Sequence, residues 1–177
     1  PITYICFLIG SLNLIGTPFL SGFFTKDLIL ELALVTYSTN GCFAYLLGII
    51  SIFFTSAYST RTLILIFISE NNASRYFIKN TQENGWKILL PLVVLTFISI
   101  LAGYVCIDLF AGVGTSFFGT SFFFNLNTNN NIDIEFIYWP FKFLPLLITF
   151  TGISFSIFMY ILEKKLLIKL KKFKLFK

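Results

Sequence analysis

Three ionisable residues, Lys26, Asp27 and Glu31, stand within six positions of one another in a segment that is otherwise almost entirely apolar. A charge at the centre of a bilayer costs about 2.5–3.5 kcal/mol on insertion scales, so such side chains usually pair or face a hydrated cavity. A partly buried lysine can exchange protons near neutral pH, and a nearby carboxylate can load or unload it. The pattern favours a site on an ion path, with a structural salt bridge between helices as the alternative.

Helical spacing gives these side chains different directions. Asp27 and Glu31 are four positions apart and share one helix face. Lys26 points about 100° away from Asp27. We therefore expect the lysine to face a polar axis and the acids to face a neighbouring helix. Arg61 is a further charge within an apolar run. It lies towards the basic end of that run, and a place on the path and a structural or snorkelling role both fit it.

A predicted helix break precedes the charges, at Gly16, Thr17 and Pro18. Proline lacks an amide hydrogen and its ring opposes the carbonyl four residues earlier, while glycine lowers the cost of irregular backbone. At membrane depth, irregular backbone is tolerated only inside protein or beside water. Transporters place such broken helices at their binding sites. We therefore expect the break to bring water and polar groups to Lys26.

Composition indicates which elements must hold these residues. Of the 177 residues, 56% are hydrophobic and 12% are charged, about half the charged share of a soluble domain. Uncharged runs of about 20 residues or more predict an all-α membrane protein with four transmembrane helices, the first discontinuous at the break. The membrane region is expected at 1–163, with a basic amphipathic tail at 164–177. The four spans are expected at about 4–36, 41–68, 87–108 and 141–163.

Charges outside the spans orient the protein. The link 69–86 is mixed in charge but holds Arg75 and Lys79, with Lys87 just after it, and the tail is strongly basic, with seven lysines. The positive-inside rule therefore places both termini on the side where the protein is made. The opposite side has Lys142 as its only basic residue, beside Asp108, Asp133 and Glu135. The tail lysines alternate with Leu, Ile and Phe, which predicts an interfacial helix that contacts lipids and no nucleic acid.

Metal and cofactor sites are not expected in this chain. It has no histidine, and Cys6, Cys42 and Cys106 are too far apart in sequence for a zinc or disulfide framework. The dominant residues are those with AT-rich codons: Phe, Lys, Asn, Ile, Leu and Tyr. No Arg-rich, Ser-rich transit peptide is recognisable. These features indicate an organelle-encoded protein.

Two segments carry a family resemblance: residues 10–31, GSLNLIGTPFLSGFFTKDLILE, and residues 55–61, TSAYSTR. Together they resemble the later part of subunit 5 of respiratory NADH dehydrogenase, the distal antiporter-like subunit of mitochondrial complex I. The resemblance covers about residues 1–70 and fades to hydropathy and helix order beyond them. It implies part of an antiporter-like helix bundle that translocates protons within NADH:ubiquinone reductase. The family lysine that matches Lys26 lies near the exit half-channel, and the matching acids are Asp27 and Glu31.

The resemblance also implies partners and a location. NADH, FMN, iron–sulfur clusters and ubiquinone would bind other subunits, and this chain would hold no cofactor. Since the chain resembles only the later helices, we expect a split subunit whose N-terminal helices lie on another chain, with a fragment of a longer chain as the alternative. Other membrane-arm subunits of complex I and lipids are further expected partners. The expected location is the mitochondrial inner membrane, with both termini on the matrix side.

Two other functions remain in view. A subunit of a multi-subunit cation/proton antiporter would share the broken helix and the membrane lysine. The organellar features and the two signature segments favour subunit 5 over this alternative. A structural anchor of the distal membrane arm is the third reading, and the intact Lys26–Asp27 pair argues against it.

Overall fold

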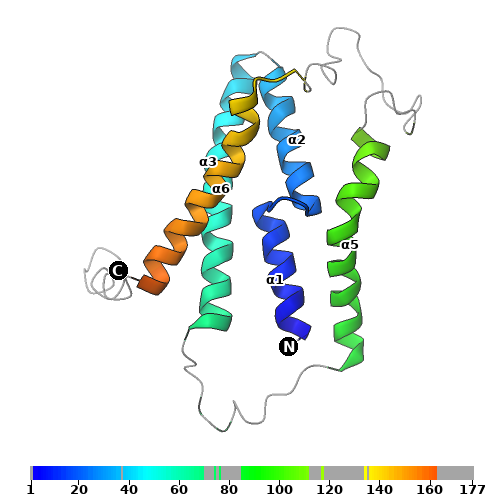
Figure 1. The fold of residues 1–177 in the computed structure, drawn as a ribbon, viewed down its shortest axis with the longest axis vertical. Helices are drawn as coiled ribbons and strands as arrows, with labels where there is room; N and C mark the ends of the chain where they lie inside the picture. Colours follow the sequence, from blue (N-terminus) through cyan, green and yellow to red (C-terminus); the bar gives the residue numbers. More distant parts are fainter. Residues whose placement is uncertain are drawn as a thin grey trace.

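The structure, a computed structural model, describes residues 2–36, 38–69, 74, 76, 85–111, 117, 134 and 136–162, with the backbone alone for 108, 110, 111 and 162. Every regular element in these ranges is helical, which confirms the all-α prediction (Figure 1). The elements are α1 (Ile2–Ile15), α2 (Ser21–Val35), α3 (Thr39–Leu63) with its π-helical extension η1 (Ile64–Ile68), α5 (Trp86–Ala111), and α6 (Trp139–Ile157) with its extension η4 (Phe158–Leu162).

Among the residues that the structure describes, three helical segments are long and apolar enough to cross a membrane: Thr39–Ile68, Trp86–Ile107 and Trp139–Ile161. Helices α1 and α2 have 14 and 15 residues. Each is therefore about 21–23 Å long, shorter than the roughly 30 Å hydrocarbon layer. The two lie end to end (Figure 1). A fourth span would need both halves together, so the count of four spans stays a prediction.

Local signals explain where the helices begin. Ser38 is the N-cap of α3, and its hydroxyl oxygen accepts a hydrogen bond from the Gly41 amide at 2.9 Å. Serine is favoured at this position because it satisfies an amide that lacks a helical partner. Helix α6 begins with a proline in its first turn, where no amide hydrogen is needed. Because Ser38 caps it, helix α3 starts at Thr39, slightly before the expected residue 41.

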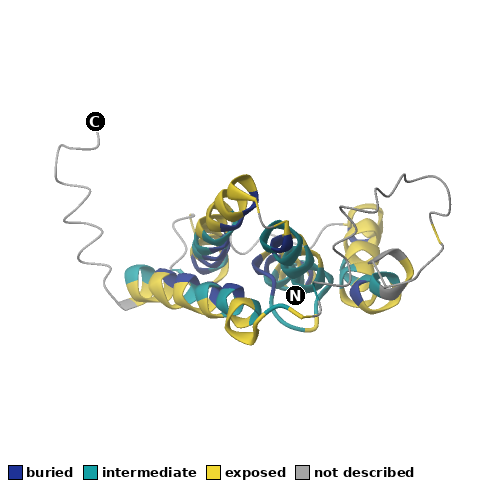
Figure 2. Ribbon diagram, turned by 90° about the horizontal axis from the view of Figure 1, so that it is seen from above, coloured by how far each residue is buried: buried dark blue, intermediate teal, exposed yellow. Residues whose placement is uncertain are grey.

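Small residues bring α3 and α6 into close contact. A Cβ added to Gly152 on α6 would collide with the Ser56 hydroxyl on α3. One turn later, Ser156 is also buried, so α6 presents small residues four positions apart to its neighbour. Membrane helices commonly pack through such pairs because small residues let the backbones approach. Figure 2 shows the buried residues of these helices turned towards the interior of the bundle.

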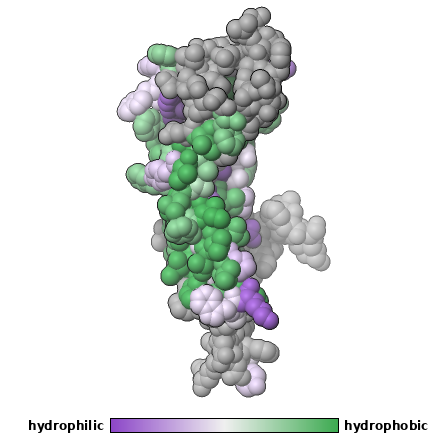
Figure 3. All heavy atoms as spheres, turned by 90° about the vertical axis from the view of Figure 1, so that its right-hand side faces the viewer, coloured by the Kyte–Doolittle hydropathy of each residue, from purple (hydrophilic) through white to green (hydrophobic). Residues whose placement is uncertain are grey.

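Helix α5 is the least covered element. Of its side chains that the structure describes, only Leu89 and Gly103 are buried. It is held to α2 partly by an edge-on contact between Phe24 and Tyr104, whose ring centroids are 5.3 Å apart. The molecular side along which α5 runs is mainly apolar (Figure 3). Such a surface suits a covering of lipid or of further helices.

Parts of the predicted topology lie outside the described residues. These include the basic residues Arg75 and Lys79, the acids Asp133 and Glu135, and the tail 164–177. The orientation of the termini and the amphipathic tail therefore stay predictions.

Candidate functional site

The break between α1 and α2 is a gap at residues 16–20 in which the chain leaves one helix and starts another. Helix α1 ends in a Schellman arrangement. The Thr17 amide donates to the Leu12 carbonyl at 3.2 Å, and the Gly16 amide donates to the Asn13 carbonyl at 3.1 Å. The break thus lies where the sequence predicted it and extends two residues beyond Pro18.

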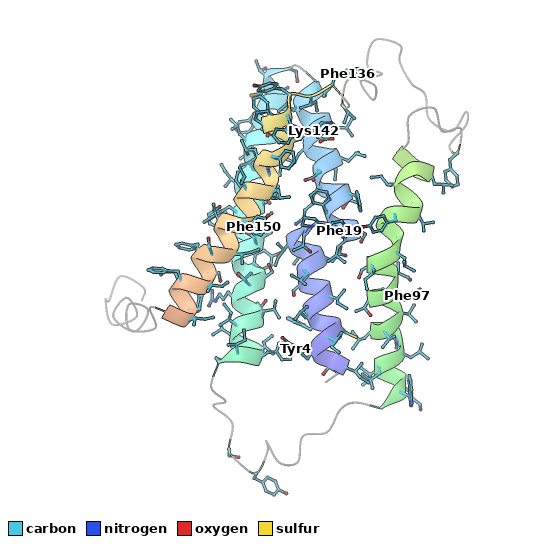
Figure 4. The ribbon with its side chains drawn as sticks, viewed as in Figure 1. Tyr4, Phe19, Phe97, Phe136, Lys142 and Phe150 are labelled. Atoms are coloured by element: carbon cyan, nitrogen blue, oxygen red, sulfur yellow. The ribbon has the colours of Figure 1, made fainter. Side chains whose placement is uncertain are left out.

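Two residues in the gap have positive φ: Gly16 at 85° and Phe19 at 74°. Glycine adopts this region freely, whereas other L-residues are disfavoured there by about 1–2 kcal/mol. Phe19 lies at the junction of the two half-helices (Figure 4), and its side chain is 75% exposed. The Thr17 hydroxyl donates to the Leu12 carbonyl at 3.2 Å and so helps to hold the irregular backbone.

Asn13, a residue that the sequence analysis missed, joins the two half-helices. Its side-chain oxygen Oδ1 accepts from the Gly22 amide at 2.6 Å and from the Ser21 hydroxyl at 3.1 Å. The N-cap residue of α2, Leu20, has no polar side chain for this purpose, so the cap comes from α1 instead. A Cβ on Gly22 would collide with the Asn13 carbonyl, so the half-helices are in direct contact. The signal that could have identified this residue in the sequence is an asparagine four positions before Thr17, at the predicted break.

Lys26 reaches back across the break. Its ammonium nitrogen Nζ donates to the carbonyl of Leu14. This carbonyl would bond the amide four residues later, but that residue is Pro18, which has none. A positive charge is also favourable at a helix C-terminus. Gly16 leaves room for the side chain, since a Cβ there would be 3.3 Å from Lys26 Cδ. The proline, the glycine and the lysine therefore form one structural unit.

The acids of α2 lie between α2 and α6, next to two small cavities. The first cavity, of about 10 Å³, is lined by Lys26, Asp27 and Thr149 among others. The second has the same volume and is lined by Asp27, Glu31, Tyr45 and Lys142 among others. Asp27 and Pro145 line both cavities. A volume of about 10–15 Å³ is what one water molecule needs, so each cavity suits about one water.

The second cavity contains a further carbonyl freed by a proline. Pro145 lies inside α6 and cannot bond the carbonyl of Phe141, four residues earlier. The hydroxyl of Tyr45, from α3, donates to that carbonyl at 3.4 Å. Lys142 attracts Glu31 electrostatically from the same cavity. In the sequence, Lys142 stood out only as the single basic residue on the side of the membrane predicted to be acidic. Its place beside Glu31 was not expected.

Arg61 lies away from this row of charges. Its side chain is exposed, and the guanidinium carbon is 5.3 Å from the centroid of the Tyr160 ring. It lines neither of the two cavities. A cation–π contact between α3 and η4 accounts for this position. The geometry favours the structural role for Arg61 over a place beside Lys26.

The arrangement suits proton exchange. It offers a lysine ammonium, two carboxylates and room for about two water molecules in a mostly apolar surrounding. Within the described part of the chain, no three His, Cys, Asp or Glu side chains are grouped closely enough to hold a metal ion. Lys26 and Asp27 are brought together at one cavity, and Asp27 and Glu31 at the other.

The acidic residues and the lysine of this site lie in a segment that matches known proteins. Residues 1–55 match the family described as NADH:quinone oxidoreductase/Mrp antiporter, TM. NADH-ubiquinone oxidoreductase chain 5 of Phytophthora infestans is 46% identical over 171 residues, which is 97% of this chain and 26% of that protein. Chain 5 of Schizophyllum commune is 39% identical over 90% of this chain and 24% of its own length. Chain 5 of Marchantia polymorpha is 46% identical over 70% of this chain and 18% of its own length.

The chain spans about a quarter of the length of the first two of these relatives. The family match contains the break, Lys26, Asp27 and Glu31, and the matches to the relatives extend over most of the remaining chain. The resemblance predicted from residues 10–31 and 55–61 is thereby confirmed, and this chain is homologous to a part of NADH-ubiquinone oxidoreductase chain 5.

Proposed function

We propose that this chain is part of a proton-translocating membrane-arm subunit of respiratory NADH:ubiquinone oxidoreductase, with Lys26 on the proton path. The observation that carries the proposal is the row of Lys26, Asp27 and Glu31 along two water-sized cavities, beside a helix break. The homology to chain 5 supports the same assignment. A chain with only a structural task would not need these charges inside a bundle.

A proton step follows from this geometry. An N–H bond of the Lys26 ammonium breaks, and its proton joins a water in the first cavity. That water gives one of its protons to the Asp27 carboxylate, so that the lysine and the aspartic acid are both neutral. Transfer from Asp27 to Glu31 through the second cavity then regenerates the Asp27 carboxylate. Reloading of Lys26 requires a proton from the other side of the break.

In this proposal, the redox chemistry takes place on other subunits. NADH, FMN, iron–sulfur clusters and ubiquinone would bind other subunits, and this chain would contribute to proton movement alone. Its partners would be the remaining helices of subunit 5, on this or another polypeptide, and the neighbouring membrane-arm subunits. The location would be the mitochondrial inner membrane, crossed four times, with both termini on the matrix side.

A cation/proton antiporter subunit is the second candidate, because the matching family includes Mrp antiporters. The relatives compared above are named chain 5 of NADH-ubiquinone oxidoreductase, which supports the first candidate. Co-migration of the chain with NADH dehydrogenase activity in a native membrane extract separates the two. A sodium-dependent transport complex without that activity would favour the antiporter.

Lys26→Met tests the path directly, because methionine keeps the length of the side chain and removes the charge. In the assembled complex, reconstituted into liposomes, we expect fewer protons moved per electron than in the unaltered complex. Lys87→Met is a matched control, since Lys87 is an exposed lysine in the first turn of α5. Unchanged pumping by Lys26→Met at normal assembly would remove Lys26 from the path. Loss of the whole complex, with the control intact, would favour the structural role.

A further inference from the structure

We propose that Lys142 on α6 is the counter-charge of Glu31, and that with Tyr45 it carries the path from α2 across to α6. This inference rests on the proposed function, because it names the next step on the same path. Lys142 is a positioning residue in this proposal: it acts on the proton through Glu31. Tyr45 supplies the hydroxyl on the third wall of the cavity.

The placement of these residues is the first argument. Glu31 comes from α2, Tyr45 from α3 and Lys142 from α6, and all three line one cavity of about 10 Å³. Figure 4 labels Lys142 near the end of α6 where α2 and α3 meet. The three helices thus enclose one water-sized space with a carboxylate, a hydroxyl and an ammonium around it. Asp27 lines this cavity and also the cavity of Lys26.

The balance of charge is the second argument. Asp27 and Glu31 repel each other electrostatically along one face of α2. Lys26 attracts Asp27, and Lys142 attracts Glu31. Each acid therefore has one lysine, the first from its own helix and the second from α6. In a bundle of low dielectric, an acid without such a partner would resist ionisation. Lys142 therefore allows Glu31 to give its proton onward and become a carboxylate.

A carbonyl freed by a proline occurs at both ends of the row of Lys26, Asp27 and Glu31. At one end Pro18 frees the Leu14 carbonyl, which accepts from Lys26. At the other end Pro145 frees the Phe141 carbonyl, which accepts from Tyr45. Phe141 lines the second cavity, and the Leu14 carbonyl holds the ammonium of Lys26, which lines the first. Polar backbone groups therefore lie on both sides of Asp27.

A double-mutant cycle in the intact respiratory complex tests the pairing of Lys142 with Glu31. The variants are Lys142→Gln, Glu31→Gln and the double variant, and each is measured for assembly and for protons moved per electron. We expect Lys142→Gln to lower the protons moved per electron by about two-fold or more, and the double variant to lose no more than Glu31→Gln alone. Lys142→Arg, which keeps the charge, should restore most of the loss. Lys87→Gln is the matched control and should pump normally.

Assembly provides a second readout if one charge cannot be removed alone. Glu31 and Lys142 are partly buried. Removing one partner of such a pair leaves the other charge uncompensated, whereas removing both is better tolerated. If Lys142→Gln does not assemble, the double variant should assemble again. An absence of this rescue would overturn the pairing, and so would losses that simply add in the double variant.

The experiment separates this inference from the proposed function. If Lys26→Met lowers pumping and Lys142→Gln leaves it unchanged, the path stands and the role of Lys142 is wrong. If Lys26→Met leaves pumping unchanged, the proposed function itself fails. Lys142→Gln with reduced pumping, restored by Lys142→Arg, supports both.

Discussion

Two regions of this protein differ in how closely their helices pack and in how polar their cavities are. At the junction of α2, α3 and α6, small residues bring the helices together, and charged side chains line cavities of about 10 Å³ each. Along α5 the helices stand further apart. A groove of about 720 Å³ runs between α1, α3 and α5, and another of about 470 Å³ lies between α2 and α5.

The difference shows what each region requires from its surroundings. The grooves beside α5 are mainly apolar, so lipid or further helices can cover them without a specific fit. The junction holds ionisable groups that lipid cannot solvate, and it must supply their partners itself. Close packing is therefore most important where the charges are. Substitutions at the junction should have larger effects than matched substitutions on the α5 side.

The largest effect is expected from Gly152→Leu. A side chain at this position collides with Ser56 on α3 and forces α6 away from the junction. Overpacking of this kind costs about 1–3 kcal/mol or more. Gly10→Leu is the matched control, because a Cβ on Gly10 meets no atom within 4 Å. The yield and thermal stability of the assembled complex measure the difference, and equal values for both variants would contradict the comparison.

Gly16→Val should come next, and it should act on pumping more than on assembly. The positive φ of Gly16 disfavours any other residue by about 1–2 kcal/mol. The added side chain also displaces Lys26 from the Leu14 carbonyl. We expect fewer protons moved per electron, measured in liposomes with Gly10→Val as the control. Normal pumping by assembled Gly16→Val would show that the position of Lys26 is not critical.

Asn13→Leu should have a smaller and more local effect. It removes the oxygen that caps α2, a loss of about 1 kcal/mol for a typical N-cap. The Gly22 amide should then exchange hydrogen about five-fold faster, since 1 kcal/mol corresponds to that factor. Hydrogen exchange of the purified complex, followed by mass spectrometry, measures this. Asn13→Asp keeps the oxygen and should exchange as the unaltered chain does; equal exchange in Asn13→Leu would exclude the cap.

The smallest effect is expected from Arg61→Gln. It removes an exposed cation–π contact with Tyr160, worth about 0.5–1 kcal/mol. Assembly should fall slightly, and the protons moved per electron should stay the same. Tyr160→Leu should reproduce the result because it removes the other half of the contact. A drop in pumping at full assembly would return Arg61 to the proton path.

Much of this molecule follows from local patterns in its sequence. The apolar runs predicted the helical segments, since a membrane helix must satisfy its backbone internally over a continuous stretch. Gly16 and Pro18 predicted the break, because the conformational limits of glycine and proline act within a few residues. The spacing of Asp27 and Glu31 predicted a shared face directed at another helix. No local pattern indicated that this helix would be α6.

The residues that the sequence analysis missed share one property. Asn13, Tyr45 and Lys142 act through partners on other helices, and the hydrogen bonds of Asn13 and Tyr45 span 8 to 96 residues. The charge pattern of the sequence related Lys142 only to one side of the membrane and gave no indication that it lies near Glu31. Such contacts depend on how helices pack, which local patterns do not specify.

Backbone chemistry and hydropathy are local properties, so the order of residues alone was enough to predict a helical, apolar chain whose first helix is broken and is followed by charges. The tertiary structure decided that Lys26 takes the carbonyl freed by Pro18 and that Tyr45 takes the carbonyl freed by Pro145. It also decided that Lys142 and Glu31 line the same cavity. These pairings require two helices to pack at one height and one rotation, and small residues such as Gly152 set both.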